Sequence, residues 1–149
     1  MFVSTYKVPV SVLVVIYTAD LQVLLLDRAD HPGYWQSVTG SQDPGETLEQ
    51  TAIREVWEET GIDVSQHRLT DWHITNTYEI YPEWRHRYAP GVTLNTEHVF
   101  GLLVPQSVTV TLSPREHLHA VWLPYQEAAR QVFSPSNAAA IKLLGASRI

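Results

Sequence analysis

Apolar residues form two nearly continuous runs near the start of the chain, at positions 9–18 and 21–28. Runs of this length that are rich in Val, Leu and Ile predict β-strands, and their unbroken apolarity predicts strands that are covered on both faces. Ala19 and Asp20 separate the runs, so we expect a hairpin there. A shorter strand over residues 35–39 should follow.

The next pattern has the period of a helix. Leu48, Ala52, Ile53, Val56 and Trp57 form an apolar stripe at helical spacing, and a helix that buries such a stripe is expected. Acidic and capping residues precede the stripe, where the positive end of a helix dipole begins. A glycine at position 61 is typical of a helix end.

The second half of the chain alternates more weakly. We expect strands over residues 69–81, 92–104, 107–112 and 118–123, a loop over 82–91, a turn at Ser113 and Pro114, and capped helices over 124–132 and 136–144. Many strands with few helices predict an α/β fold in which a mixed sheet lies between helical layers.

Composition narrows the class of protein. A chain of 149 residues with 44% hydrophobic residues fits one globular domain over 1–149, and the lack of cysteine excludes disulfides and thiolate sites. The apolar run near the N-terminus is too short to span a bilayer and is not followed by a small-residue cleavage site, so a cytoplasmic protein without membrane contact is expected. A net charge of −6 disfavours binding of a nucleic-acid polymer. It does not disfavour a small polyphosphate that arrives with its own Mg²⁺.

Three carboxylates share one face of the predicted helix. Glu55, Glu58 and Glu59 are spaced i, i+3 and i+4, and like charges at this spacing repel one another. Mg²⁺ and Mn²⁺ prefer carboxylate oxygens and water as ligands. The spacing therefore favours a site for Mg²⁺, with Mn²⁺ as the alternative.

The stretch over residues 40–62, GSQDPGETLEQTAIREVWEETGI, resembles the signature of the Nudix hydrolases, G-x5-E-x7-R-E-U-x-E-E-x-G-U with U apolar. Every position of the signature is filled. A solvated acidic helix with a glycine stop would explain the charge but not the full spacing. The resemblance implies a Nudix-type α/β/α sandwich with a mixed β-sheet and metal-dependent hydrolysis of a phosphoanhydride bond.

The same resemblance suggests roles for the charged residues. It implies metal binding by Glu55, Glu59, Glu58 and a carboxylate from a later loop, for which Glu116 is the candidate and Glu97 the alternative. A glutamate that is free of the metal can act as general base, but the sequence leaves open which one. Arg54 is expected to orient the glutamates through bidentate hydrogen bonds rather than touch substrate. Glu46 is expected to hold the loop or the helix start.

The histidines offer a rival metal site. His117 and His119 would share one face of a strand, as zinc ligands can, but no third ligand is evident. A structural or surface role is therefore the preferred interpretation.

Over nearly its full length the chain is also similar to the bacterial dihydroneopterin triphosphate pyrophosphohydrolases, through YKVPVSVLVVIY, YWQSVTG, RHRYAPGVTLNTE and PREHLHAVWL. This similarity implies release of pyrophosphate from a small pterin triphosphate in folate biosynthesis, with dATP and other nucleoside triphosphates as further substrates. Tyrosine rings can stack on a pterin or purine. Residues implied near substrate are Lys7, Arg28, Thr39, Tyr78, Glu79, Ile80, Tyr81, Glu116 and Ser134.

Other functions are also consistent with the sequence. An RNA 5′-pyrophosphohydrolase would use the same signature and hold its chain with Arg85, His86 and Arg87, although the acidic balance disfavours it. A general nucleoside-diphosphate-X hydrolase of the same family is a further alternative. A nucleotide-sensing module without activity would be expected to have a damaged signature, and this one is complete.

Overall fold

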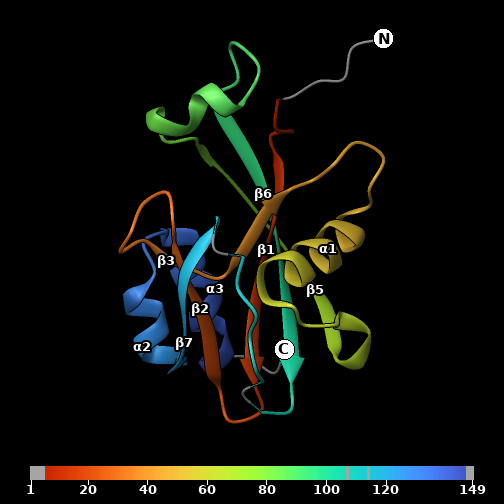
Figure 1. Cartoon of the computed structure of the whole chain (residues 1–149), viewed down its shortest axis with the longest axis vertical. Helices are drawn as coiled ribbons and strands as arrows, with labels where there is room; N and C mark the ends of the chain where they lie inside the picture. Colours follow the sequence, from red (N-terminus) through yellow and green to blue (C-terminus); the bar gives the residue numbers. More distant parts are fainter. Residues whose placement is uncertain (1–5, 107, 114, 147–149) are drawn as a thin grey trace.

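A seven-stranded mixed sheet lies between two helical layers in the computed structural model, which describes residues 6–106, 108–113 and 115–146 (Figure 1). The main path of the sheet runs β3-β2-β1-β6-β5, with β4 paired to β1 and β7 paired to β2. The strands are β1 (Val10–Thr18), β2 (Gln22–Arg28), β3 (Trp35–Gln36), β4 (Val38–Ser41), β5 (Arg68–Glu79), β6 (Leu94–Val104) and β7 (His117–Pro124). The helices are α1 (Leu48–Thr60), α2 (Tyr125–Gln131) and α3 (Pro135–Ala146), with 3₁₀ turns η1 (Val64–Gln66) and η2 (Pro82–Arg87).

The two helical layers bury separate clusters of apolar side chains. Val14 and alternate residues of β1 pack with Val56 of α1 on one face. Val15 and its alternates pack with Ile141 of α3 on the other face. Because β1 is covered on both sides, nearly all of its residues must be apolar, as its sequence shows. The predicted α/β/α sandwich with a mixed sheet is confirmed.

Strand β1 changes partner along its length, and this opens the sheet. Its first half, Ser11 to Val14, pairs with β4, whereas Tyr17 near its end pairs with Val23 of β2. On its other edge β1 pairs with β6 in parallel over its whole length. A fork therefore separates β4 from β2 and β3.

Helix α1 has the ends that its sequence predicts. Thr47 and Gln50 form a reciprocal capping box, in which each side chain accepts a hydrogen bond from the other residue's backbone N–H. Gly61 ends the helix with φ of 73°, a left-handed conformation that favours glycine, and its N–H donates to the Trp57 carbonyl.

The structure corrects several local predictions. Residues 108–112 form no strand, and Ser107, like Pro114 of the predicted turn, lies outside the described residues. Val108, Val110 and Leu112 still pack against the α1 core, so the alternating pattern reflects burial without a partner strand.

Other corrections concern boundaries. The predicted loop over 82–91 contains η2, and the predicted strand over 35–39 is divided between β3 and β4 because it pairs with β2 and then β1. Strand β5 ends at Glu79, short of the predicted 81. Helix α2 begins after Pro124 without a side-chain cap. None of the described helices is long and apolar enough to cross a membrane.

Candidate active site

A cavity of about 1130 Å³ opens at the fork in the sheet. Its walls come from β1, β4, the loop after β4, helix α1, the end of β5, and the start of α3. Glu55 and Glu59 line this cavity, and so does every residue that the sequence placed near substrate. Glu58 does not line it; its side chain is 47% exposed, and it lines a neighbouring depression together with Glu116.

Arg54 holds the signature loop against helix α1. Its Nε and Nη2 donate to the two carboxylate oxygens of Glu46 at 2.7 and 2.9 Å, and Nη2 also donates to the Ser41 carbonyl. Its Nη1 donates to Glu55 Oε1 at 2.6 Å and to Glu58 Oε2 at 3.4 Å. The bond from Arg54 lowers the pKa of Glu46 to about 2, so that carboxylate stays ionised. Arg54 thus connects Glu46 of the loop to Glu55 of the helix and fixes the orientation of the Glu55 carboxylate.

Glu59 is the most confined carboxylate of the site. Its side chain is 2% exposed, and neither carboxylate oxygen has a hydrogen-bond partner among the described residues. Burial raises the pKa of Glu59 well above its usual value, and the neighbouring Glu55 and Glu116 carboxylates raise it further. Gly40 leaves the space for Glu55, since a Cβ there would lie 2.1 Å from the Glu55 carboxyl carbon.

These carboxylates fit a divalent cation, although no three carboxylate or imidazole groups of the described chain are already arranged around one point. Two buried oxygens of Glu59 without partners are costly unless a donor or a cation meets them. The Glu116 residue is exposed as a whole, but partial desolvation of its carboxylate, together with the charges of Glu55 and Glu58, raises the pKa of Glu116. Carboxylate oxygens from Glu55, Glu59 and Glu116 are the hard ligands that Mg²⁺ or Mn²⁺ takes.

His117 is a neighbour of the site that the sequence left as a structural or surface residue. It is 4% exposed, with Nε2 at 3.6 Å from Glu59 Oε1 and 3.3 Å from Gln36 Nε2. Burial chiefly lowers the pKa of His117 to about 4, so the ring is neutral near pH 7. His119 is 70% exposed beyond a register shift in the β2–β7 pairing, so the two histidines do not form a zinc pair.

Two cations predicted to lie near substrate do line the cavity. Arg28 forms a two-pronged pair with Asp30 at 2.7 and 2.6 Å, and Arg87 reaches the same carboxylate at 2.8 Å. The backbone N–H of Lys7 donates to the Arg87 carbonyl. Burial, and then the charges of Arg87 and Arg28, lower the pKa of Lys7, whereas the Glu55 and Glu59 carboxylates raise it. Lys7, Arg28 and Arg87 thus bring positive charge into the cavity that Glu55 and Glu59 also line.

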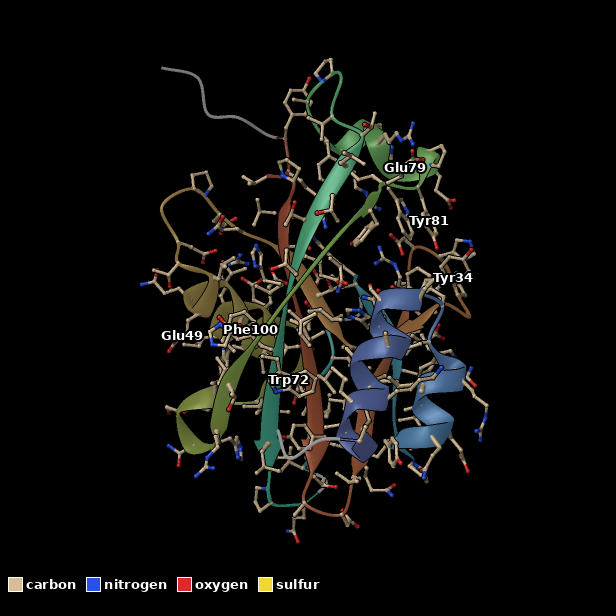
Figure 2. The ribbon with its side chains drawn as sticks, turned by 180° about the vertical axis from the view of Figure 1, so that it is seen from behind. Tyr34, Glu49, Trp72, Glu79, Tyr81 and Phe100 are labelled. Carbon is tan, nitrogen blue, oxygen red and sulfur yellow. The ribbon has the colours of Figure 1, made fainter. Side chains whose placement is uncertain are left out.

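An aromatic wall lies beside these cations. The Tyr81 and Trp84 rings stack with centroids 5.2 Å apart, Phe133 meets both edge-on, and the Arg28 guanidinium lies 4.5 Å from the Trp84 ring centre. Figure 2 shows Tyr81 below the end of β5, on the side of the loop that carries Tyr34. One face of the Tyr81 ring is therefore occupied by protein. Phe133 was not predicted near substrate. Trp84 is not among the residues that the resemblance implied there, although an aromatic residue in a loop rich in arginine is a usable signal.

The remaining residues that were predicted to lie near substrate differ in their exposure and hydrogen bonding. The Thr39 hydroxyl donates to the Val12 carbonyl, and Ser134 Oγ lies 3.0 Å from Ser136 Oγ. Ile80 is 4% exposed, whereas the Glu79 side chain is 79% exposed at the end of β5 (Figure 2). Tyr78 shares a hydrogen bond with Asn95 at 3.1 Å.

Glu97, the alternative to Glu116 as the fourth carboxylate, lies elsewhere in the same cavity. It is 3% exposed on β6, and Asn76 Nδ2 donates to it at 3.3 Å. It therefore belongs to the sheet surface between β1 and β5 and not to the glutamate cluster of α1.

The fold and the complete signature together indicate the protein family. The NUDIX domain model matches residues 7–144, and the chain belongs to the NUDIX family.

Within this family, the chain is similar to individual proteins over nearly its whole length. The chain is 50% identical over 142 residues to the dihydroneopterin triphosphate diphosphatase of Escherichia coli strain K12, covering 93% of each chain. It is 44% identical to the protein of that name from Haemophilus influenzae, covering 92% of this chain and 87% of that one. The solved structure of the E. coli dihydroneopterin triphosphate pyrophosphohydrolase superposes with a TM-score of 0.88 at 49% identity, covering 93% of this chain and 96% of that one.

Proposed function

We propose that this protein is a metal-dependent pyrophosphohydrolase that converts dihydroneopterin triphosphate to dihydroneopterin monophosphate and pyrophosphate in folate biosynthesis. The observation that carries the proposal is the buried, unpartnered Glu59 carboxylate facing a cavity that Lys7 and Arg28 also line. The similarity to two dihydroneopterin triphosphate diphosphatases over nearly the whole chain supports the choice of substrate.

In this proposal Glu55, Glu59 and Glu116 hold the divalent cation, and the exposed Glu58, which lies in one depression with Glu116, completes the ligand set. When bound, the cation neutralises phosphate charge and lowers the pKa of water. Arg54 acts on the glutamates and not on substrate, because its donors are already used by Glu46, Ser41 and Glu55. Whichever glutamate of this set does not contact the cation directly serves as general base.

The cationic side of the cavity positions the triphosphate. Lys7 and Arg28 supply positive charge to the phosphate oxygens, and Arg28 is kept in place by Asp30 and the Trp84 ring. Tyr81, Trp84 and Phe133 supply flat surfaces for the ring of the substrate. Thr39 and Ser134 offer hydrogen-bonding groups between the two ends. Nucleoside triphosphates such as dATP share the triphosphate and are further substrates in this proposal.

The experiment is product analysis by phosphorus NMR in ¹⁸O-water with Mg²⁺. The panel holds dihydroneopterin triphosphate, dATP and a 5′-triphosphate RNA. We expect a monophosphate and pyrophosphate from dihydroneopterin triphosphate. Orthophosphate as the first product would contradict the reaction class, and hydrolysis confined to the RNA would replace the substrate with the polymer.

A further inference from the structure

Two arginines from distant parts of the chain share one carboxylate on the cationic side of the cavity. Arg28 at the end of β2 and Arg87 at the end of η2 both donate to Asp30, although Asp30 and Arg87 are 57 positions apart in sequence. We call these three residues the Asp30 cluster. All three line the cavity, and their side chains are 16–32% exposed. A ligand in the cavity therefore has access to the cluster.

The Asp30 cluster carries more positive than negative charge. The hydrogen bond from Arg28, and after it the one from Arg87, holds the pKa of Asp30 well below its usual range, so this carboxylate is ionised. One carboxylate balances one of the two guanidiniums. No other Asp or Glu in the described part of the chain forms an ion pair with either arginine. The unbalanced positive charge favours an anionic ligand.

The two arginines differ in how many of their donors the protein already uses. Each guanidinium nitrogen of Arg28 donates a hydrogen bond: Nε and Nη2 to Asp30, and Nη1 to Gln36 at 3.1 Å. Among the described residues, the Arg87 side chain donates only from Nη2, to Asp30 at 2.8 Å. Nε and Nη1 of Arg87 thus stay available. A guanidinium that is held at one corner and has free donors is well suited to bind a phosphate.

Arg87 lies at the end of the cavity where the aromatic wall is. Its carbonyl accepts a hydrogen bond from the Lys7 N–H at 2.9 Å, and its guanidinium lies 5.9 Å from the Trp84 ring centre. Trp84 belongs to the wall that the proposed function assigns to the ring of the substrate. A ring on this wall therefore brings its first phosphate closer to Arg87 than its other phosphates.

The other two cations act closer to the glutamates. The charges of Lys7 and Arg28 partly offset the rise that burial and neighbouring carboxylates cause in the pKa of Glu116. Lys7 and Arg28 are thus near enough to the glutamates to bind the phosphates that a cation would hold there. Arg87 is left for the phosphate at the ring end.

We propose that Arg87, held by Asp30, binds the phosphate next to the ring of the substrate. In the proposed reaction this phosphate stays in the monophosphate product. The inference rests on the proposed function, because it assigns one phosphate of that substrate to one residue. Arg87 is a binding residue here, whereas Lys7 and Arg28 hold the phosphates that leave as pyrophosphate.

The test compares the ring with and without one phosphate, and it needs no turnover. NMR shift titrations of the full chain with Mg²⁺ at low ionic strength measure the Kd of dihydroneopterin and of dihydroneopterin monophosphate. The ratio of the two Kd values is the gain from the first phosphate. We expect a gain of about tenfold or more in wild type, because hydrogen bonds between charged groups contribute that much.

Arg87→Gln removes the charge and most of the donors. The gain should fall to less than about threefold, while the Kd of dihydroneopterin itself should stay within about threefold of wild type. Arg85→Gln is the matched control, because it removes the same charge from the same turn. Arg85 does not line the cavity, and its side chain instead donates to the Ile80 carbonyl and pairs with Glu79. The control should keep the wild-type gain.

Pyrophosphate with Mg²⁺ tests which phosphate Arg87 binds. It lacks the phosphate next to the ring, so its Kd should change by less than about twofold in Arg87→Gln, as expected for separate sites. A role of Arg87 as a general source of positive charge would instead weaken pyrophosphate and monophosphate alike.

Four results would overturn the inference. The first, a wild-type gain below about threefold, requires no variant to fold. The others are an undiminished gain in Arg87→Gln, equal weakening of dihydroneopterin and its monophosphate, and equal weakening of pyrophosphate and the monophosphate. Failure of the proposed function is separate. A gain that depends on Arg87 without release of pyrophosphate would leave this inference standing, whereas release of pyrophosphate without such a gain would remove it alone.

Discussion

Gly40 and Glu55 are in such close contact that no other residue type fits at position 40 without moving the carboxylate. A Cβ at Gly40 would lie 2.1 Å from both the carboxyl carbon and Oε2 of Glu55. The glycine of the signature is thus explained by space for a glutamate that comes 15 residues later on a different element.

Gly40→Ala should therefore lower activity through Glu55. We expect kcat/KM to fall by about tenfold to a thousandfold, because a displaced side chain loses part of its transition-state interaction. The measurement is steady-state kinetics of Gly40→Ala, Glu55→Gln and the double variant. Their effects should be strongly non-additive, since both act on one carboxylate. Additive losses would mean that Gly40 acts through the backbone.

Glu59→Gln should nearly abolish turnover while the protein stays folded. It removes a charge from a proposed ligand, and a loss of a few kcal/mol in the transition state lowers the rate by about two to three orders of magnitude. Mg²⁺ should raise the melting temperature of wild type and not of the variant, because an ion at 100 times its Kd stabilises by about 2.7 kcal/mol. Near-normal activity at saturating Mg²⁺ would exclude Glu59 from the site.

Without divalent ions Glu59→Gln should increase stability, and the gain should grow with pH. The folded pKa of Glu59 is raised above the unfolded value near 4.5, so the folded state binds the extra proton. Wild type thus loses stability as pH rises from about 4.5 through the folded pKa. Urea unfolding in EDTA at several pH values measures this, with exposed Glu49→Gln as the control. A gain that is independent of pH would contradict the burial argument.

His117→Gln should have the opposite pH dependence. The folded pKa of His117 is lowered to about 4, so below pH 6.5 the unfolded chain binds more protons and wild type loses stability as pH falls. Relative to wild type, the variant should gain stability between pH 6.5 and 4, by at most about 3 kcal/mol. The same urea series measures it, with exposed His119→Gln as control. Parallel pH profiles of wild type and variant would rule out a buried neutral ring.

Tyr81→Ala should raise KM more than it lowers kcat. Loss of a stacking surface costs about 1–3 kcal/mol of binding, and Trp84 would also lose its partner. Kinetics with dihydroneopterin triphosphate provide the measurement, and Tyr125→Ala on α2 is a control outside the cavity. A fall in kcat at unchanged KM would mean that the ring of the substrate binds away from this wall.

Arg54→Lys tests the residue that joins Glu46 and Glu55 within the signature. A lysine keeps the charge but cannot donate in a fork to Glu46 and also reach Glu55, so we expect a loss of activity together with about 1–3 kcal/mol of stability. Urea unfolding and kinetics measure the two effects, and exposed Arg130→Lys is the control. Full retention of both would show that only the charge at position 54 matters.

Helix α1 and its carboxylates could be read from the sequence because every determinant is local. The capping box spans the four residues from Thr47 to Gln50, Gly61 directly follows the last helical residue, and the i, i+4 spacing of Glu55 and Glu59 fixes their common face. The buried runs of β1 and β2 were equally clear, since nearly all residues of a strand covered on both faces are apolar. These local rules, with the signature, determined the fold class and the chemistry at the glutamate end.

Only the tertiary structure decided what surrounds those carboxylates. Ser11 meets Asn95 across 84 positions of sequence, and Asn76 meets Glu97 through a β5–β6 register that includes a bulge. Register depends on the pairing of whole strands, so local pattern could not tell that Glu97 would lie on the sheet surface opposite Asn76 and not beside the glutamates of α1. The strand predicted over 107–112 was wrong for the same reason, because alternation shows which side chains are buried but not whether a partner strand is available. Val108, Val110 and Leu112 pack against the core, and residues 108–112 do not pair with the sheet.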